Sequence, residues 1–383
     1  RSEYLTRIPD RHVAGIYIHI PFCHSKGAYC DFFSTSGNSG RATFVESLSR
    51  EWAMRRHELG DAPVRTIYLG GGTPSILSTG ELNKIASLLP VSKLEEFTIE
   101  ANPEDISVQH VKDMISIGIN RISIGVQSLN DRELQAVGRR HTSQDAIEAI
   151  ATIRKAGIYN ISADLIYGLP GQTADSWRES VQRLSECGIT HLSAYALSYE
   201  PGTRLYSMLR AGKIKEAPQE LSEEMYNILC ETMARQGFLH YEISNFAIPG
   251  MHSRHNSSYW DYTPYLGLGP GAHSFDGQLR RVNPSRLQSY NEAMMAGRIF
   301  YETEEETHVD RLNDIIITAM RTREGLCMEK FRQAGGVSAL ITLKRNASAF
   351  IKSGRIVCTN TSMYIPERYW LVSDAILREL LID

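Results

Sequence analysis

An alternation of short apolar runs with helical stretches over the first 200 residues most constrains the fold. Six runs are rich in β-branched and aromatic residues, and a stretch with helical periodicity separates each from the next. The runs lie near Ile16, Ile67, Ile99, Ile124, Leu165 and Tyr195, and the helices between them are expected at 42–59, 79–89, 108–118, 143–157 and 174–188. Runs such as "RISIGV" are apolar almost throughout, which indicates strands covered on both faces and hence a parallel sheet.

Strand–helix units of this kind close into a barrel, or into part of one when six are present, and ligands then bind at the carboxyl ends of the strands. The alternation stops after about residue 200, and from about residue 308 three helices, a hairpin and a last helix follow. We therefore predict an α/β fold with a partial (β/α)6 TIM-like barrel over 1–240, a connecting segment over 241–300, and a C-terminal α+β winged-helix-like domain over 301–383.

Charge and hydropathy narrow the possible partners. The formal net charge is -3, with 41 basic and 44 acidic residues and no long run of either sign, so nucleic acid and anionic membranes are not expected as partners. The C-terminal domain is accordingly interpreted as a scaffold or partner surface. No segment approaches the roughly 18 consecutive apolar residues of a membrane span, and the charged start lacks the centre of a signal peptide, which predicts a cytoplasmic protein.

Six cysteines are too few for a disulfide framework, which favours thiols or metal ligands. Four of them, Cys187, Cys230, Cys327 and Cys358, stand alone in apolar or helical surroundings and are expected to be ordinary buried thiols.

The loop "YIHIPFCHSKGAYCDFF", residues 17–33, follows the first run. Cys23 and Cys30 bracket Gly27 where a third thiolate would complete a C-x3-C-x2-C pattern. Iron–sulfur clusters prefer thiolate ligands, and closely spaced cysteines on one loop can reach different irons. Two cysteines alone are weak evidence: either the loop never held a cluster, or it is built for one that this chain binds poorly.

"YIHIPFC" followed by "YCDF" resembles the cluster loop of radical S-adenosylmethionine (SAM) enzymes, in the group of the oxygen-independent coproporphyrinogen III oxidases. The likeness continues through "LGGGTPS" at 69–75, "TIEANPE" at 98–104, "GINRISIGVQS" at 118–128, "GRRH" at 138–141, "DLIYGLPGQT" at 164–173, "SYEPGT" at 198–203, and "HNSSYW" and "YLGLGPGAHS" between 255 and 274. The chain is identified as a member of this group. The resemblance implies a barrel of the radical SAM type, with S-adenosylmethionine and a 4Fe-4S cluster as cofactors.

The chain departs from the family at one cluster ligand. The family's three cysteines correspond here to Cys23, position 27 and Cys30, and position 27 is glycine. Glycine offers no ligand atom, and neither His24 nor Ser25 stands at the right spacing to replace a thiolate. The cluster is therefore expected to bind weakly or to be absent, with Cys23 and Cys30 as its remaining ligands.

Other polar motifs follow strand ends and suit an adenosyl cofactor. "GGGTP", residues 70–74, offers backbone without side chains, although alone it could be only a tight turn. Carboxylates suit ribose hydroxyls or an ammonium group, and a guanidinium suits a carboxylate, although each such residue could instead form a surface salt bridge. The resemblance implies cofactor contacts by Tyr17, Tyr29, Gly71, Gly72, Thr73, Glu100, Gln127, Arg139 and Asp164.

"RHNSSYW", residues 254–260, could be a satisfied core cluster. Imidazole is nevertheless a common axial ligand of heme iron, and aromatic rings pack well on a porphyrin face. The motif resembles that of the heme chaperone branch of the group, the HemW branch, which implies heme binding by His255, Asn256, Tyr259 and Trp260. The nearby "GLGPGAHS" is not interpreted as a dinucleotide loop, because Pro270 interrupts it and no clear helix follows.

Two functions compete: a heme chaperone that passes heme to a recipient apo-hemoprotein, and a coproporphyrinogen III oxidase that decarboxylates its substrate by radical chemistry. The family's oxidases have a further cysteine two residues beyond the third ligand, where this chain has Phe32, and a longer N-terminal arm than the 22 residues before Cys23. These features and "HNSSYW" favour the chaperone, with heme or porphyrin as ligand. Enzymatic activity and a homodimer remain open, and a metal-free protein that keeps only the fold is a third possibility.

Overall fold

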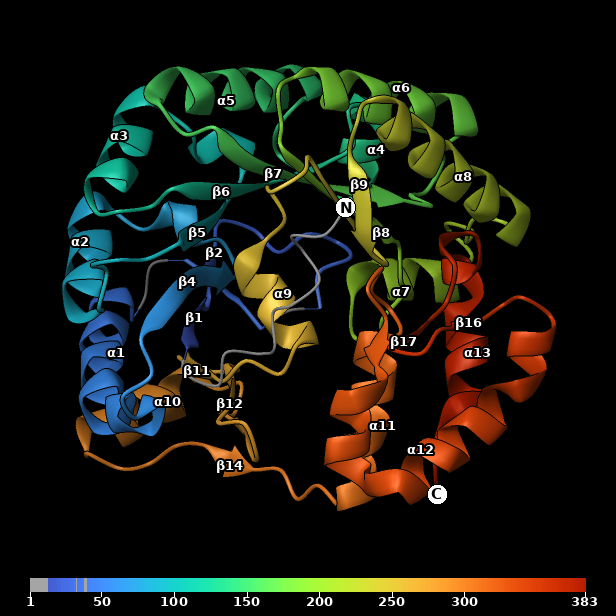
Figure 1. The fold of residues 1–383 in the computed structure, drawn as a ribbon. Helices are drawn as coiled ribbons and strands as arrows, with labels where there is room; N and C mark the ends of the chain where they lie inside the picture. The colour runs from blue at the N-terminus through green and yellow to red at the C-terminus, as the bar shows by residue number, and fades with distance from the viewer. Residues whose placement is uncertain (1–12, 32, 38–39) are drawn as a thin grey trace.

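The computed structural model describes residues 13–31, 33–37 and 40–383, so Phe32 and the N-terminal stretch cited above lie outside the described residues. Six parallel strands lie side by side in chain order and confirm the six predicted runs (Figure 1). They are β1 (Ala14–Ile20), β4 (Val64–Gly71), β5 (Glu96–Ala101), β6 (Arg121–Gln127), β7 (Asn160–Tyr167) and β8 (His191–Ala196). All seven residues of β6 are buried, as the apolar run predicted.

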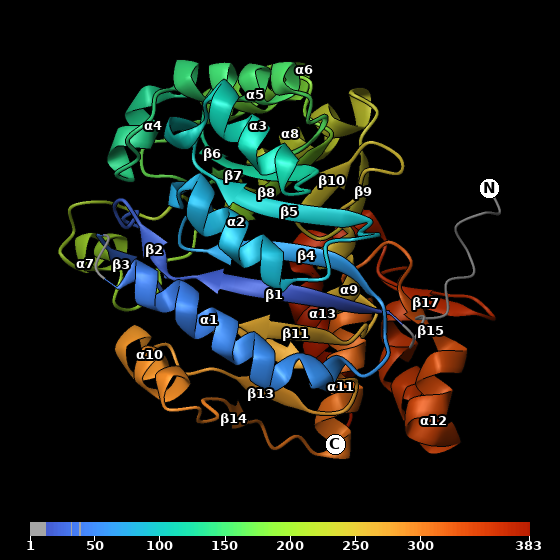
Figure 2. The same cartoon turned by 90° about the vertical axis from the view of Figure 1, so that its left-hand side faces the viewer.

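Helices cover the outer face of these strands (Figures 1 and 2). They are α1 (Arg41–Arg55), α2 (Thr79–Leu88), α3 (Val108–Ser116), α5 (Ser143–Ala156), α6 (Ala174–Glu186) and α8 (Gln219–Arg235), while the two shorter helices α4 (Asp131–Ala136) and α7 (Arg204–Arg210) lie inside this outer ring (Figure 1). Local signals set their ends: Thr142 and Asp145 form a capping box at the start of α5, and Gly157 ends it in the left-handed conformation. Short 3-10 turns occur at η1 (Arg56–Leu59), η2 (Pro74–Ile76) and η3 (Pro103–Asp105).

The barrel is not closed, because further strands extend both edges of the sheet. Beside β1 lie β11 (Tyr265–Leu268), β12 (His273–Phe275), β13 (Arg280–Val282) and β14 (Glu302–Thr303), and beside β8 lie β10 (Asn245–Ala247) and β9 (Leu239–Glu242). The glycine-rich "GLGPGAHS" spans the antiparallel β11–β12 hairpin, not a strand-to-helix turn. A separate two-stranded pair, β2 (Phe22–Cys23) and β3 (Thr35–Ser36), carries the first cysteine, and α10 (Leu287–Met295) packs on α1.

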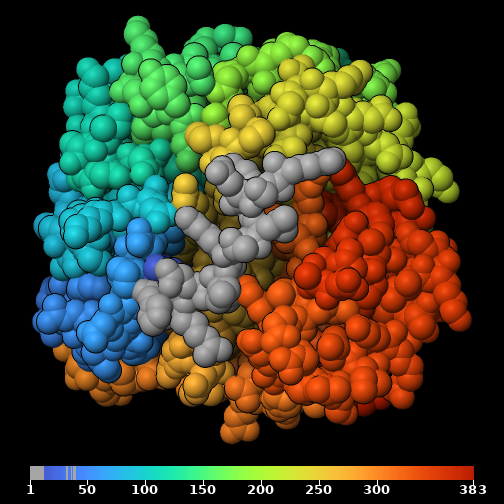
Figure 3. Space-filling view, in the orientation of Figure 1, coloured from blue at the N-terminus to red at the C-terminus, as the bar shows by residue number. Residues whose placement is uncertain are grey.

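The C-terminal residues form a compact lobe beside the barrel (Figure 3). The lobe contains α11 (His308–Ala319), β15 (Leu326–Cys327), α12 (Met328–Lys352), β16 (Val357–Cys358), β17 (Ser362–Tyr364), η4 (Glu367–Val372) and α13 (Ser373–Leu380). Gly336, with φ 75°, divides α12 into two helices, so the order is helix, strand, helix, helix, strand, strand, as in a winged helix. No helix within the described ranges has both the length and the apolarity needed to cross a membrane.

Antiparallel contacts join the C-terminal lobe to the barrel edge. Glu242 of β9 forms a bridge with Thr322, the Ile243 amide donates to the Arg321 carbonyl at 3.1 Å, and the Arg323 amide donates to the Tyr241 carbonyl at 3.0 Å.

The helix α9 (Arg254–Trp260) lies across the starts of the central strands (Figure 1). The predicted heme-binding residues on α9 thus lie at the starts of the strands, whereas predicted cofactor contacts such as Glu100 and Gln127 lie at their carboxyl ends.

Candidate functional site

Glu100, near the end of β5, lies inside the barrel with both carboxylate oxygens hydrogen-bonded. The Tyr68 hydroxyl donates to Oε1 at 2.9 Å, and the Gly71 amide donates to Oε2 at 3.0 Å. Burial still outweighs these bonds and raises the pKa of Glu100 from 4.5 to about 7. The carboxyl group therefore changes its protonation near neutral pH.

A second carboxylate and an arginine also lie in the barrel interior. Burial raises the pKa of Asp164 to about 6, and the Ser123 hydroxyl donates to it at 3.4 Å. Arg121, at the start of β6, is 1% exposed, and its Nε and Nη1 atoms have no hydrogen-bond partner. Its charge lowers the pKa of both Asp164 and Glu100. The sequence analysis missed Arg121, because its role depends on the inward side of a strand whose run is otherwise apolar.

Arg139 belongs to a polar network at the C-terminal ends of the strands. Its Nη2 donates to Asn102 Oδ1 at 2.7 Å and to the Gly125 carbonyl at 2.8 Å, while Asn102 Nδ2 donates to Thr73 Oγ1 at 3.3 Å. The Arg139 Nε is buried without a partner, which suits an incoming anionic group. Gln127 ends β6 with φ 66°, an uncommon conformation for a residue with a side chain. Asn102, which the sequence analysis missed, connects two predicted residues.

The glycine run is required by packing against the cysteine loop. A Cβ on Gly72 would lie 2.4 Å from the Phe22 carbonyl oxygen, and Gly71 has φ 111°. The Gly72 amide donates to the Ile20 carbonyl at 2.8 Å, and the Thr73 amide donates to the Phe22 carbonyl at 2.7 Å. The glycines thus hold the end of β4 against the segment that carries Cys23, and the predicted cofactor contacts Gly71, Gly72 and Thr73 adjoin the predicted cluster loop.

The cysteine loop lacks a complete ligand set for a cluster. Cys23 is 5% exposed, and the Cys30 amide donates to the Gly27 carbonyl at 3.1 Å in a tight turn. His24 is directed to Asp105, with 3.1 Å between Nε2 and Oδ1. Among the described residues, this loop does not bring three His, Cys, Asp or Glu ligand atoms within 4.8 Å of one another. The residues present therefore do not fit a three-thiolate cluster site.

Position 27 nevertheless has room for a cysteine. Gly27 does not have a positive φ, and the three atoms nearest to a Cβ there all belong to the ring of Tyr29, the closest at 3.2 Å. Tyr29 is half-buried, and burial raises the pKa of its hydroxyl. A small shift of this ring admits a thiol side chain.

His255 lies at the other end of the barrel, on α9, and is 0% exposed. Its Nδ1 is 2.9 Å from Thr66 Oγ1, and its Nε2 is 2.9 Å from the Tyr259 hydroxyl. Burial lowers the pKa of His255 to about 4, so the imidazole is neutral at physiological pH. Asn256 and Trp260 are half-buried on the same helix.

Glu96, the first residue of β5, fixes the start of α9. Its carboxylate accepts the backbone N–H groups of Arg254 at 2.8 Å and His255 at 3.1 Å, while the Ser253 hydroxyl accepts the Asn256 amide at 3.3 Å. These bonds satisfy donors that a helix start leaves unpaired, and the negative charge suits that end of the helix.

Two tyrosines connect the ends of the barrel. The ring of Tyr68 lies 5.3 Å from the His255 ring and 6.1 Å from the Tyr17 ring, and the Tyr17 ring lies 6.5 Å from the His255 ring. Tyr68 also bonds to Glu100. The structure thus brings His255, Tyr17 and Glu100 into one buried cluster, whereas the cysteine loop lies at the opposite strand ends from α9.

Comparisons with known proteins show which chains this one resembles. A model of the radical SAM superfamily matches residues 17–184. The heme chaperone HemW of Bacillus subtilis is 36% identical over 84% of this chain and 87% of its own, and HemW of Mycobacterium tuberculosis is 30% identical over 96% and 94%. The radical S-adenosyl methionine domain-containing protein 1, mitochondrial, of Danio rerio is 31% identical over 85% and 77%.

Among solved structures, the coproporphyrinogen III oxidase HemN of Escherichia coli, a radical SAM enzyme, has a similar fold. The TM-score is 0.82, and the match covers 97% of this chain and 91% of HemN at 20% sequence identity. At that identity the likeness concerns the fold.

Proposed function

The chain belongs to the radical SAM superfamily and, within it, to the family of the heme chaperone HemW, and we propose that it binds heme and delivers it to a recipient apo-hemoprotein. The observation that carries this proposal is the similarity to HemW over 84% of the chain, together with the "HNSSYW" motif on α9 at the starts of the barrel strands. The likeness to HemN concerns the fold and gives no support to the alternative, an oxidase function.

The geometry indicates how His255 takes part. Its imidazole is neutral and so keeps a lone pair for iron, but both ring nitrogens already have side-chain partners. For Nε2 to ligate heme, it must leave the Tyr259 hydroxyl. The half-buried Asn256 and Trp260 on the same helix would contact the porphyrin once α9 opens. Heme loading is thus expected to include a local movement of α9.

We also propose an S-adenosylmethionine site at the carboxyl ends of the strands. The buried, unpartnered Nε of Arg139 would hold the carboxylate of the ligand, and Glu100 would accept hydrogen bonds from its ammonium or hydroxyl groups. Radical chemistry at this site would require a 4Fe-4S cluster, for which Cys23 and Cys30 would be the protein ligands. Because Gly27 removes one thiolate, we propose that the cluster binds weakly here and that heme binding does not depend on it.

The cysteine content and the net charge bear on the compartment and the partners of the protein. Six sparse cysteines fit a reducing compartment, so we propose that the protein acts in the cytoplasm. The net charge of -3 gives no reason to expect nucleic acid as a partner.

A heme titration followed by Soret absorbance tests the proposal. The chain is expected to saturate at about one heme, and His255→Ala should weaken binding by at least about tenfold, with His57→Ala, an exposed histidine on η1, as the control. Trp260→Ala provides a second variant that leaves the buried bonds of His255 intact. Equal affinities in all four proteins, or no saturable binding, would contradict the proposal.

A further inference from the structure

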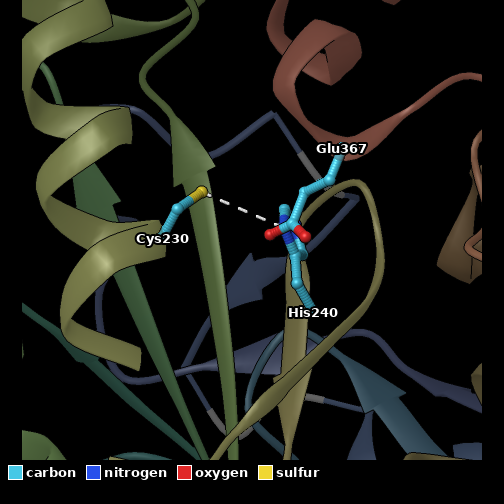
Figure 4. Close-up of side chains that lie close together, drawn as sticks. All are labelled: Cys230, His240 and Glu367. Atoms are coloured by element: carbon cyan, nitrogen blue, oxygen red, sulfur yellow. Dashed lines mark hydrogen bonds and ion pairs between the residues drawn. The ribbon is translucent and has the colours of Figure 1, made fainter. Parts of the chain in front are cut away.

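Three side chains with different ligand atoms converge at the junction between the barrel and the C-terminal lobe (Figure 4). They are Cys230 of α8, His240 of β9 and Glu367 of η4. The Cys230 Sγ lies 3.9 Å from His240 Nδ1, which lies 2.9 Å from Glu367 Oε1, and all three ligand atoms lie within 4.8 Å of one another. The expectation that Cys230 stands apart as an ordinary buried thiol is therefore wrong, and Cys327, expected to be buried, is exposed.

The imidazole of His240 is fixed so that Nδ1 faces the other two groups. Its ring stacks on Phe246 at 4.0 Å and meets Trp370 edge-on at 4.4 Å. Its Nε2 lies 3.3 Å from the Ile243 carbonyl oxygen, which can accept the Nε2 proton in the tautomer that leaves Nδ1 free to act as a ligand. A metal-bound histidine commonly donates its other N–H to a carbonyl in this way.

The contact between His240 Nδ1 and Glu367 requires a proton or a metal cation between the two atoms, because two acceptors 2.9 Å apart repel. A proton on Nδ1 gives a hydrogen bond from a neutral ring or an ion pair from a charged one. In the tautomer protonated on Nε2, a metal cation bound by Nδ1 and the carboxylate takes the place of that proton. The thiol of Cys230 on the same side adds a soft ligand atom that a simple ion pair would not require.

The cluster borders an open cavity of about 240 Å³, which Arg323 and Phe238 also line. His240 is buried, while the Glu367 side chain is 49% exposed, so the cavity reaches solvent. It has room for a cation and for a water molecule on its solvent side.

We propose that Cys230, His240 and Glu367 form a zinc site whose fourth position is open to water. Thiolate, imidazole and carboxylate are the ligands that Zn²⁺ takes, at roughly 2.3, 2.0 and 2.1 Å, and in a tetrahedral site these atoms lie about 3.3–3.6 Å apart. The observed separations, 2.9 Å between Nδ1 and Oε1 and 3.9 Å between Sγ and Nδ1, lie on either side of this range. Coordination releases the Cys230 thiol proton to solvent, and His240 keeps its Nε2 proton.

The site would fasten the C-terminal lobe to the barrel edge. Two ligands come from α8 and β9, and the third comes from η4, 127 residues beyond His240. Zinc would therefore strengthen the junction that the Glu242–Thr322 bridge already forms. This role is independent of heme and of the cysteine loop.

Cobalt and zinc binding test the site in the full chain carrying Cys23→Ser and Cys30→Ser, so that the cysteine loop cannot contribute. This parent should bind one Co²⁺ with a thiolate-to-cobalt charge-transfer band that Zn²⁺ abolishes by displacement. Cys230→Ser should abolish the band, and Glu367→Gln should weaken Co²⁺ binding at least about tenfold. The matched controls Cys358→Ser and Glu379→Gln, in the same lobe, should leave both unchanged.

Thermal unfolding provides the second measurement. Zinc should raise the Tm of the parent and the controls but not that of Cys230→Ser or Glu367→Gln. Because Glu367 is half-exposed, its variant keeps the buried core and is expected to fold. No saturable metal binding by the parent, or a charge-transfer band that persists in Cys230→Ser, would overturn the proposal and leave a His–Glu ion pair. Neither result depends on heme binding, so the zinc proposal and the heme proposal can fail independently.

Discussion

The hydroxyl of Tyr259 lies 2.9 Å from Nε2 of His255, one turn apart on α9. This bond occupies the nitrogen that heme iron would need, so removing it should favour loading. Tyr259→Phe keeps the ring and deletes the hydroxyl, and we expect heme to bind about fivefold more tightly, since a neutral hydrogen bond contributes about 1 kcal/mol. Soret titration of the variant beside Tyr206→Phe measures the effect. Weaker binding would mean that the hydroxyl itself contacts heme.

Restoring the third thiol should restore the cluster. The atoms nearest to a Cβ at position 27 belong to the Tyr29 ring, so Gly27→Cys is expected to fold and, after anaerobic reconstitution, to hold about four irons and four sulfides per chain. The unsubstituted chain should hold much less. Gly80→Cys on α2, where the glycine has no positive φ and a Cβ meets no atom within 4 Å, is the control. Equal iron and sulfide contents in all three proteins would contradict the explanation that Gly27 weakens cluster binding.

The buried carboxyl of Glu100 should make stability depend on pH. Its folded pKa of about 7 exceeds the ordinary 4.5, so between these values the folded state holds a proton that the unfolded chain has lost. The free energy of unfolding therefore falls as pH rises through this window, on the order of 2 kcal/mol after allowance for partial screening.

Glu100→Gln removes this titration while its amide can still accept from Gly71 and donate to Tyr68. The free energy of unfolding of both proteins is measured by urea unfolding at pH 4.5 and at pH 8. The difference between the variant and the unsubstituted chain should shift in favour of the variant at pH 8. Exposed Glu302→Gln should show no such gain. A difference that does not change with pH would mean that Glu100 titrates normally in the folded protein.

Glu96 should control the docking of α9. Glu96→Ala removes the acceptor for two backbone N–H groups, and we expect a loss of about 2 kcal/mol and faster hydrogen exchange at Arg254 and His255. Adjacent Glu95→Ala removes ion pairs with the side chains of Arg65 and Arg254, which should cost less than about 1 kcal/mol. Unchanged exchange in Glu96→Ala would show that other contacts hold the helix.

The sequence predicted the parallel strands because burial on both faces leaves nearly continuous apolar runs such as that of β6. It did not predict α4, whose six residues are too few to show a helical period. Cysteine, glycine and "HNSSYW" motifs marked both ends of the barrel because they are contiguous in the chain.

Residues that act through tertiary contacts left no such signal. Arg121 and Tyr68 face the barrel interior only because of strand register, and Asn102 matters because it joins Thr73 to Arg139. The convergence of Cys230 with Glu367 depends on how the C-terminal lobe packs on β9, which no local pattern encodes.

The open sheet has a consequence for self-association. A barrel that does not close leaves strand edges whose backbone groups can pair with another chain. At β9 the segment around Thr322 occupies that edge through a bridge and two backbone hydrogen bonds. The C-terminal lobe thus covers the edge of β9 and prevents edge-to-edge pairing there. A chain cut before α11 would expose the backbone groups of β9.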